Sequence, residues 1–516
     1  MKYKVKDFIE IKNKIQQMSL KELLKCICCP NIVIGRDEPP IDYASFFLNS
    51  ASKDEIDDFV NEIKCKSKYN PLIAIDAECG TGCAIKNTTV FPSMWALGKT
   101  KDLNLAYQIG AFGAKEAIDC GCQWAFGPCV DILFNHLNPV VSTRSISDNA
   151  DEVLQLSKSY IQGLEDYGMV ATIKHFPGDG VGEFDQHIST SINTLNKEDW
   201  DKSFRLVYQT LINEGVKVIM AGHIALPCYD EIDRETDLYR PATLSKNILK
   251  KLLREDLGFE GIVVSDALNM GGFCNYMNFY DGIVTFLNCG GDCLLFVTAD
   301  EKLEYEIEKR LQKNEIKIDV IRNAAYRMLC FNKECYEIFQ YRKILPQSFN
   351  KDDLIKKITF NSVEVVKDRL NVLPINNSKS KDVLHIILPI PGTENEIIER
   401  TNLLTNKLKE RFFSVTEMID PGEKNINKFI DENKCDLIIC SILNFNAYGL
   451  NNVKLCGPVA RNLMGGWLKK GVPTIFISHN DPFFHETFIT LNETIINAYG
   501  YSKYTNEAIL KLIVNE

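Results

Sequence analysis

The sequence predicts an α/β protein that combines a TIM-like (β/α) barrel with a smaller α/β layered domain. In the first part of the chain, short apolar runs rich in valine and isoleucine alternate with longer amphipathic segments. Runs of this kind, without polar alternation, are typical of parallel strands that are buried on both faces. A polar segment interrupts the pattern, which then restarts. The predicted domains are a TIM-like barrel over residues 1–342, a linker over 343–358 and a C-terminal α/β sandwich domain over 359–516.

Seven strands of the barrel can be assigned, one fewer than a complete (β/α)8 barrel requires. Either one strand is hidden or the barrel is irregular. The assigned strands are NIVIG (31–35), PLIAID (71–76), CQWAFG (122–127), VATIKH (170–175), VKVIMA (216–221), GIVVS (261–265) and DCLLFV (292–297). The helices expected between them cover residues 104–120, 152–167, 199–214 and 245–257.

The second domain begins after the polar segment KILPQSFNK (343–351), which contains Pro346 and follows a predicted helix around residues 319–330. Helical segments again separate apolar runs, as is typical of a layered α/β domain. The strands predicted here cover residues 382–390, 414–420, 435–443, 472–479 and 494–500.

Composition restricts the class of protein. The 516 residues carry 59 basic and 69 acidic side chains, which gives a formal net charge of −10. Hydrophobic residues at 45% and charged residues at 25% exclude a disordered chain, a collagen-like fibre and a coiled-coil rod. The excess of acidic residues, and the lack of any cluster of basic residues in the sequence, argue against nucleic acid and anionic membranes as partners. No apolar stretch is long enough for a membrane span or a signal peptide, so we expect a soluble, cytoplasmic protein.

The 18 cysteines are scattered along the chain. Clusters such as Cys79/Cys83 and Cys120/Cys122 lack the paired C-x-x-C spacing of zinc sites. We interpret the cysteines as reduced and mostly buried side chains of a cytoplasmic protein.

Ionisable residues follow five successive predicted strands, at the ends where the βα loops of a barrel meet. A helix cap would explain one such residue but not the whole set, which therefore predicts an active site. For Asp131 taken alone, a cap and a site role are equally well supported. The residues are Asp76 with Glu78, Asp131, Lys174 with His175, His223 and Asp266.

The segment KHFPGDGVGEFDQH (174–187) is the most informative part of the sequence. Its three glycines allow positive φ angles and motion, and the sequence lacks the G-x-x-x-x-G-K-[ST] pattern of a phosphate-binding loop. Asp185 stands two residues before His187, and an aspartate beside a histidine can fix its tautomer and raise its basicity. The loop therefore predicts a working acid/base pair rather than a surface turn.

Asp266 follows the fully apolar run GIVVS. A carboxylate in this position is costly to bury unless it has a partner, although it could also cap the next helix. Lys174 and His175 are predicted at the same barrel mouth and would keep Asp266 ionised. An ionised carboxylate in a dry pocket is a nucleophile or a charge stabiliser.

These motifs together resemble glycoside hydrolase family 3, in its β-N-acetylglucosaminidase branch. They occur in the order of the family and with roughly its spacing over about residues 13–330, which makes the ordered set far more specific than one motif. The segments similar to the family motifs are IDAECG (75–80), NPVVSTRSIS (138–147), KHFPGDGVGEFDQH (174–187), VIMAGHIALP (218–227) and GIVVSDALNM (261–270).

The resemblance implies a retaining glycosidase that removes terminal β-N-acetylglucosamine from cell-wall muropeptide or chitin-type fragments. Asp266 would form a covalent glycosyl-enzyme intermediate, and His187, oriented by Asp185, would be the general acid/base. The partner would be a small carbohydrate, no cofactor or metal would be needed, and the oligomeric state stays open. The residues implied to line the sugar pocket are Asp76, Arg144, Lys174, His175 and His223.

Some positions depart from the family pattern. Asp179 replaces the histidine of P-G-H-G, Gln186 replaces the serine of D-S-H, and Cys79 replaces the first glycine of a glycine pair. Arginines found in many members are missing near Thr81 and Ala84, so an altered sugar preference is an open alternative.

Other functions also fit parts of the pattern. A histidine acid/base places no second negative charge beside an incoming anion, so a phosphorylase using inorganic phosphate is one alternative, and a β-glucosidase-type member of the same family is another. A non-catalytic sugar sensor would keep the fold and the pocket. A metal-dependent hydrolase would use suitable ligand types at His175, Asp179, Asp185, His187 and Asp266.

Overall fold

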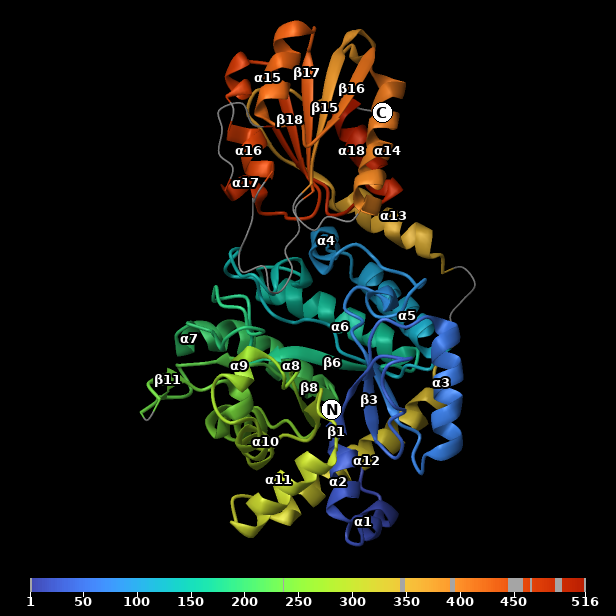
Figure 1. Cartoon of the computed structure of the whole chain (residues 1–516), viewed down its shortest axis with the longest axis vertical. Coiled ribbons are helices and arrows are strands. Elements are labelled where there is room, and N and C mark those ends of the chain that lie inside the picture. Colours follow the sequence, from blue (N-terminus) through green and yellow to red (C-terminus); the bar gives the residue numbers. More distant parts are fainter. Residues whose placement is uncertain are drawn as a thin grey trace. The chain divides into compact units, whose positions relative to one another are not determined.

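The computed structural model of the chain divides into two compact units (Figure 1). One comprises Met1–Met94 and Lys101–Lys351, and the other comprises Trp95–Thr100 and Asp352–Glu516. The residues that the structure describes are 2–234, 236–343, 349–389, 395–443, 458–464, 466–487 and 494–514.

The first unit is a barrel of parallel strands. A seven-stranded sheet in the order β12-β8-β6-β5-β4-β3-β2 curls round, and the parallel pair β1–β13 lies between its two ends. A bridge between Val264 and Cys293 joins β13 to β12. A single residue, Pro30, separates β1 from β2. Proline has no N–H to donate to a neighbouring strand, which accounts for the break. The two short strands therefore occupy one of the eight strand positions of the barrel. The strands are β1 (Cys28–Cys29), β2 (Asn31–Ile32), β3 (Ser45–Leu48), β4 (Leu72–Ile75), β5 (Trp124–Ala125), β6 (Val170–Phe176), β8 (Val218–Ala221), β12 (Ile262–Ser265) and β13 (Leu294–Leu295).

The strand that the sequence did not reveal is β3. Its four residues, SFFL, are all buried, and it pairs with β2 on one side and with β4 on the other. It is short and closely follows a proline pair, so it lacks the long valine- and isoleucine-rich run that marks the other strands. The predicted TIM-like barrel with a second α/β domain is confirmed, with β3 as its hidden strand.

Helices surround the barrel, and several begin at residues that cap them. Ser19 and Glu22 form a reciprocal capping box at the start of α2, and Ser52 and Glu55 do the same for α3. In the described part of the chain, no helix is long and apolar enough to cross a bilayer. The longer helices are α1 (Ile9–Ile15), α2 (Leu20–Ile27), α3 (Lys53–Lys66), α5 (Leu103–Asp119), α6 (Ala150–Asp166), α8 (Leu206–Glu214), η5 (Asn247–Asp256), α10 (Phe279–Asn288), α11 (Glu301–Gln312) and α12 (Ile318–Gln340). Shorter elements are η1 (Thr81–Cys83), η2 (Ser142–Arg144), β7 (Ser191–Ile192), α7 (Lys197–Trp200), η3 (Asp201–Arg205), β9 (Ile224–Ala225), β10 (Ile232–Asp233), β11 (Leu238–Tyr239), η4 (Ala242–Leu244) and α9 (Gly271–Cys274).

Helices α5 and α6 approach each other closely because glycines face the contact. A Cβ atom on Gly110 would lie 2.3 Å from the carbonyl oxygen of Tyr160, and one on Gly163 would lie 2.2 Å from that of Tyr107. Neither position tolerates a larger side chain without moving a helix.

The barrel interior is filled by aromatic side chains. The Trp124 ring lies 5.1 Å from that of Phe126 and 5.5 Å from that of Phe331, which α12 contributes. The Trp124 indole N–H donates to the Thr172 hydroxyl at 2.7 Å, so no polar group of this ring is left unpaired in the core. Such a packed core leaves the polar chemistry to the strand ends.

The second unit has helices on both faces of a six-stranded sheet (Figure 1). The order is β14-β19-β18-β17-β15-β16, with all neighbours parallel except the edge strand β14. Alternate residues enter two separate cores: Val383 joins one with Ile509, and Leu384 joins the other with Trp467. The strands are β14 (Glu364–Asp368), β15 (Asp382–Pro389), β16 (Ser414–Ile419), β17 (Leu437–Leu443), β18 (Thr474–Ser478) and β19 (Thr494–Asn497). The helices are α13 (Lys351–Ser362), α14 (Asn395–Arg411), α15 (Glu423–Glu432), α16 (Pro458–Met464), η7 (Trp467–Lys470), α17 (Phe484–Thr487) and α18 (Lys503–Val514), with the short turn η6 (Ser378–Ser380).

Two features of this unit are not visible in the local sequence pattern. Most of helix α4 (Met94–Thr100) belongs to it, since the Trp95 ring lies 5.0 Å from that of Phe483. Within the expected linker 343–358, residues 344–348 lie outside the described residues, and 351–358 form the first part of α13.

Candidate active site

Polar side chains from several strands gather at the carboxyl end of the barrel. Lys174 and His175 lie near the carboxyl end of β6, and Asp76 directly follows β4. Asp266 follows β12, and its backbone N–H donates to the carbonyl of Ala221, the last residue of β8, at 2.8 Å. The strand ends therefore bring together residues that lie far apart in the sequence.

Asp266 is a buried carboxylate that stays ionised. Its side chain is 12% exposed, and Oδ2 lies 4.0 Å from Nε2 of His175. The Ala267 N–H donates to Oδ1 at 2.8 Å. Burial acts to raise the pKa of Asp266, but the field of His175, with smaller effects from other imidazoles and the Ala267 N–H, outweighs it and lowers the pKa. In this state a carboxylate can act as a nucleophile.

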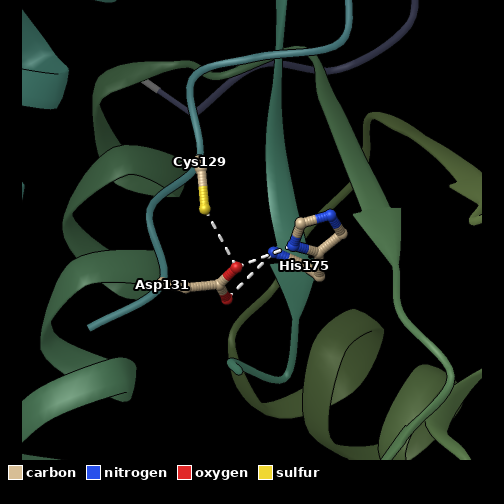
Figure 2. Close-up of side chains that lie close together, drawn as sticks. All are labelled: Cys129, Asp131 and His175. Carbon is tan, nitrogen blue, oxygen red and sulfur yellow. Dashed lines mark hydrogen bonds and ion pairs between the residues drawn. The ribbon is translucent and has the colours of Figure 1, made fainter. Parts of the chain in front are cut away.

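The orientation of His175 is fixed by Asp131, which is completely buried (Figure 2). The Asp131 carboxylate accepts from the backbone N–H of His175 at 3.1 Å and lies 2.6 Å from its Nδ1. Nδ1 therefore carries a proton, which directs Nε2 towards Asp266 and towards Nη2 of Arg144 at 3.4 Å. Burial would raise the pKa of Asp131, but His175 and further hydrogen bonds hold it below its usual value.

A metal ion does not fit this cluster. Among the described residues, one group has three potential ligand atoms within 4.8 Å of one another, namely Cys129, Asp131 and His175 (Figure 2). The Cys129 thiol donates to Asp131 at 3.0 Å, and burial raises the pKa of this thiol well above its usual value. The same Asp131 oxygens already accept from His175 and from the Asp179 N–H. The donor set is thus satisfied within the protein.

Lys174 and Arg144 are both held by Glu78. The guanidinium of Arg144 donates to Glu78 through two bonds of 2.9 and 2.7 Å, and Nζ of Lys174 lies 2.6 Å from the same carboxylate. Burial would raise the pKa of Glu78, but the two cations outweigh it and depress the pKa strongly. Glu78 is therefore a permanent anion that fixes the two cations.

Asp76 differs from Glu78 in exposure. It accepts from Nζ of Lys174 at 3.0 Å, but 49% of its side chain is exposed, against 13% for Glu78. A half-exposed carboxylate that is already anchored can accept hydrogen bonds from the hydroxyls of a ligand.

His187 and Asp185 form a second histidine–carboxylate pair. Nδ1 of His187 lies 2.7 Å from Oδ1 of Asp185, and the backbone N–H of His187 donates to the same oxygen at 2.8 Å. The Asp185 carboxylate is fully buried, whereas the imidazole is 28% exposed. The imidazole is thus partly exposed while its Nδ1 is fixed, as general acid/base chemistry requires.

The loop that carries His187 is docked on the segment that follows Asp266. The N–H of Gly271 donates to the carbonyl of His187 at 2.8 Å, and the N–H of Gly272 donates to that of Gln186 at 3.0 Å. The field of His187 also contributes to the lowered pKa of Asp266. The two candidate catalytic groups therefore belong to one connected structure.

His223 is buried behind the segment that follows Asp266 and is not accessible to solvent. It is fully buried; its Nδ1 lies 3.0 Å from the Thr243 hydroxyl, and its Nε2 lies 3.0 Å from the carbonyl of Ala267. Burial lowers its pKa, so the ring is neutral and both nitrogens are occupied within the protein. The structure thus places His223 as a support for the Asp266 segment, while the other implied pocket residues share the network around Glu78 and Asp266.

Asp179 is an unusual carboxylate at this site. Its Oδ1 accepts from Asn138 at 2.9 Å and from the Gly180 N–H at 2.7 Å, but its buried Oδ2 has no hydrogen-bond partner in the described part of the chain. Burial, followed by the nearby charge of Asp131, raises the pKa of Asp179 to about 6. The hydroxyl of Tyr208 is also buried and has no hydrogen-bond partner among the described residues; burial raises its pKa, and the charge of Asp179 adds to this effect.

The sequence placed Glu78 among the strand-end residues that predict a site but gave it no specific role, and it left the role of Asp131 open. Both follow strand ends, which is the signal that marked the other residues. What the sequence does not contain is their distant partners: Arg144 lies 66 residues beyond Glu78, and His175 lies 44 residues beyond Asp131.

Comparison with known sequences identifies the family. Residues 3–330 match the profile described as "Glycosyl hydrolase family 3 N terminal domain". The chain belongs to glycoside hydrolase family 3. The resemblance inferred from the motifs is confirmed, and the protein is a glycosidase of this family.

Relatives and solved structures cover most of the chain. A "Beta-N-acetylglucosaminidase/beta-glucosidase" of Cellulomonas fimi is 28% identical over 460 residues, which cover 85% of this chain and 80% of the relative. The structure of a β-glucoside phosphorylase, 23% identical, superposes with a TM-score of 0.88 over 98% of this chain and 94% of that one. A family 3 β-N-acetylglucosaminidase from Paenibacillus sp. str. FPU-7, 22% identical, superposes with a TM-score of 0.79, and the match covers 96% of this chain and 97% of that one. At this identity, the two superpositions establish the shared fold.

We expect Asp179→Asn to stabilise the protein at neutral pH and to have little effect in acid. The amide keeps the size and the acceptor oxygen but cannot ionise. Because the pKa is raised from 3.8 to about 6, the folded wild type binds a proton that the unfolded chain has lost, and its free energy of unfolding falls as the pH rises from about 4 to about 6. The full difference is about 3 kcal/mol, since one pKa unit corresponds to about 1.4 kcal/mol.

The measurement is the unfolding midpoint of both proteins at about pH 7.5 and about pH 4.5. The control is Asp58→Asn, which removes an exposed carboxylate on α3 and should change neither midpoint. A variant that is no more stable than the wild type at pH 7.5, or equally stabilised at both pH values, would contradict the account of Asp179.

Proposed function

We propose that the protein is a retaining glycosidase that removes terminal β-N-acetylglucosamine through a covalent glycosyl-Asp266 intermediate. The observation that carries the proposal is the joint placement of two groups. Asp266 is buried and ionised, and the His187–Asp185 pair, whose imidazole is 28% exposed, is bound through its backbone to the Asp266 segment. One group supplies a nucleophile and the other supplies a proton.

In the first step, protonated His187 gives the proton on Nε2 to the leaving oxygen while Asp266 attacks the anomeric carbon. Asp185 stabilises the imidazolium and holds Nδ1–H in place. In the second step, neutral His187 removes a proton from water, which attacks the same carbon and releases the Asp266 carboxylate. Retaining enzymes usually employ two carboxylates, and here an imidazole takes the place of one.

The remaining polar residues would hold the sugar ring. Asp76 is exposed enough to accept from ring hydroxyls, whereas Lys174 and Arg144 are positioned by Glu78 to donate to them. Polar groups in such a site discriminate strongly between sugars, because a sugar without the matching hydroxyl leaves their remaining hydrogen-bonding capacity unused. The acetamido preference is supported by the K-H-F-P-G…D-x-H loop and by the name of the C. fimi relative, which includes both the β-N-acetylglucosaminide and the β-glucoside activity.

Phosphorolysis is the second candidate function. Hydrogen phosphate would replace water in the second step and give a sugar 1-phosphate. The specific observation in its favour is that the Asp185 carboxylate is fully buried behind the imidazole, so an incoming anion meets the ring and not a second exposed carboxylate. The fold shared with a β-glucoside phosphorylase is compatible with this reaction.

We further propose that the substrates are cell-wall muropeptide or chitin-type fragments in the cytoplasm. The cysteines that the structure describes are all free thiols, which supports a reducing compartment.

Asp266→Asn should fold normally and lose turnover. The amide has nearly the same volume but is not a nucleophile, so kcat on an activated aryl glycoside should fall by about 10³-fold or more. Binding of the product sugar and the unfolding midpoint serve as controls for an intact site. A kcat within about tenfold of the wild type would rule out Asp266 as the nucleophile.

His187→Ala should harm substrates with poor leaving groups much more than activated aryl glycosides. A poor leaving group needs the proton, so its kcat/KM should fall by about 10²-fold or more, whereas nitrophenyl glycosides should lose far less in the first step. Asp185→Asn should show a milder form of the same pattern.

His485→Ala is the matched control, because this histidine is 25% exposed in the second unit, close to the 28% of His187. It should leave both substrate types unaffected. Equal losses on both substrates in His187→Ala would mean that His187 is structural.

The sugar preference can be measured directly with a pair of substrates. We expect kcat/KM for the aryl β-N-acetylglucosaminide to exceed that for the aryl β-glucoside by about tenfold, or about 1.4 kcal/mol in the transition state. The same assay with and without inorganic phosphate separates hydrolysis, which gives the free sugar, from phosphorolysis, which gives the 1-phosphate. A preference for the glucoside would refute the acetamido assignment and leave the catalytic residues untouched.

A further inference from the structure

We propose that Cys79 and Cys83 form a redox-active dithiol that exchanges with small disulfides and thereby changes the affinity of the neighbouring sugar site. This inference deepens the proposed function, on which its activity readout depends. The two Sγ atoms lie 3.3 Å apart, within hydrogen-bond distance for sulfur, at the two ends of the turn that contains η1. Sulfur atoms at this distance need only a small movement to form a disulfide of about 2.05 Å.

The turn between the two cysteines holds them in this arrangement. Gly80 has a φ of 108°, and a Cβ at this position would lie 2.5 Å from the carbonyl oxygen of Thr89. The Gly82 N–H donates to the same carbonyl at 2.8 Å, and the Thr81 hydroxyl donates to the carbonyl of Gly113 at 2.9 Å. The backbone between the thiols is therefore fixed before any reaction.

The pair differs from the other cysteines that the structure describes. Most of these are buried, and burial raises the pKa of their thiols. Cys83 is exposed, and the hydrogen bond that it receives from Cys79 lowers its pKa. The same hydrogen bond is the largest cause of the raised pKa of Cys79. Cys83 is thus the attacking thiol and Cys79 the resolving one.

The exchange reaction balances with oxidised glutathione as the oxidant. The Cys83 thiolate attacks one sulfur of the glutathione disulfide, and a glutathione thiolate leaves. The Cys79 thiol then loses its proton and attacks the Cys83 sulfur in the mixed disulfide, and the second glutathione leaves and takes up a proton. The protein loses two electrons and two protons, and one glutathione disulfide becomes two thiols.

The dithiol is adjacent in the sequence to a residue of the candidate sugar site. Cys79 follows Glu78, the residue that holds Lys174 and Arg144. The charges of Glu78 and Asp76 both act on the Cys83 thiol, which places the pair within electrostatic reach of the site. Closing the distance between the two sulfurs moves Cys79, the direct neighbour of Glu78, so we expect the disulfide to raise KM about threefold or more, with a smaller effect on kcat.

The test is to incubate the whole protein with oxidised glutathione and to analyse its tryptic peptides. Residues 69–86 form one tryptic peptide that contains both cysteines and no other. We expect this peptide to lose two hydrogens, a mass decrease of about 2 Da, while Cys65, an exposed cysteine on α3, stays a thiol for longer. In Cys79→Ser, Cys83 should instead keep glutathione as a stable mixed disulfide.

Activity is measured on the same samples. In the wild type, KM should rise on oxidation and return on reduction with dithiothreitol, whereas in Cys83→Ser it should not respond, and Cys65→Ser should behave like the wild type. The inference is overturned if the peptide stays reduced, if Cys65 reacts as fast, or if the disulfide forms without changing KM. The mass readout does not require activity, so a protein without glycosidase activity refutes the proposed function, and an active enzyme that forms no disulfide refutes only this inference.

Discussion

Asp131 is a fully buried carboxylate that receives hydrogen bonds from three chain segments. It accepts from the backbone N–H groups of His175 and Asp179, from the His175 ring and from the Cys129 thiol. These bonds join the loop after β5, the end of β6 and the start of the glycine-rich loop. A buried charge is tolerated only when its partners are present, and removing one partner of such a pair typically costs about 3–5 kcal/mol. The positions of His175 and of the loop that leads to His187 therefore depend on this one carboxylate.

The other charges of the site follow from this arrangement. Two carboxylates, Glu78 and Asp131, are occupied by fixed partners and act as positioning groups. Among the described residues, Asp266 accepts one hydrogen bond, from the Ala267 N–H, and its Oδ2 lies 4.0 Å from Nε2 of His175, so we propose that it is the carboxylate that reacts with a ligand. Asp179 carries an oxygen without a hydrogen-bond partner among the described residues, near Asp131, and this carboxyl group keeps its proton up to about pH 6. Burial and hydrogen-bond partners thus give the carboxylates of the site different properties: two are permanently ionised, Asp266 is the proposed nucleophile, and Asp179 titrates.

Much of this could be predicted from the sequence, because strand ends and motif order are local properties. The apolar runs revealed seven of the eight barrel positions, and the polar residues behind them marked Asp76, Lys174, His175 and Asp266. The short strand β3 and the edge strand β14 lacked such runs. A strand end does not tell which way a side chain points, so the inward orientation of His223 needed the structure. The assignment of Trp95–Thr100 to the second unit and the pairing of Glu78 with Arg144 depend on contacts between distant segments.

The central claim is that Asp266 forms a bond to the sugar. The most direct measurement uses an activated glycoside with a fluorine that slows the second step, followed by mass analysis of the intact protein and fragmentation of its peptides. We predict one sugar per chain, attached to Asp266 and released when turnover resumes. A sugar attached to another carboxylate such as Asp76, or rapid turnover of the aryl glycoside without any covalent adduct, would contradict the account.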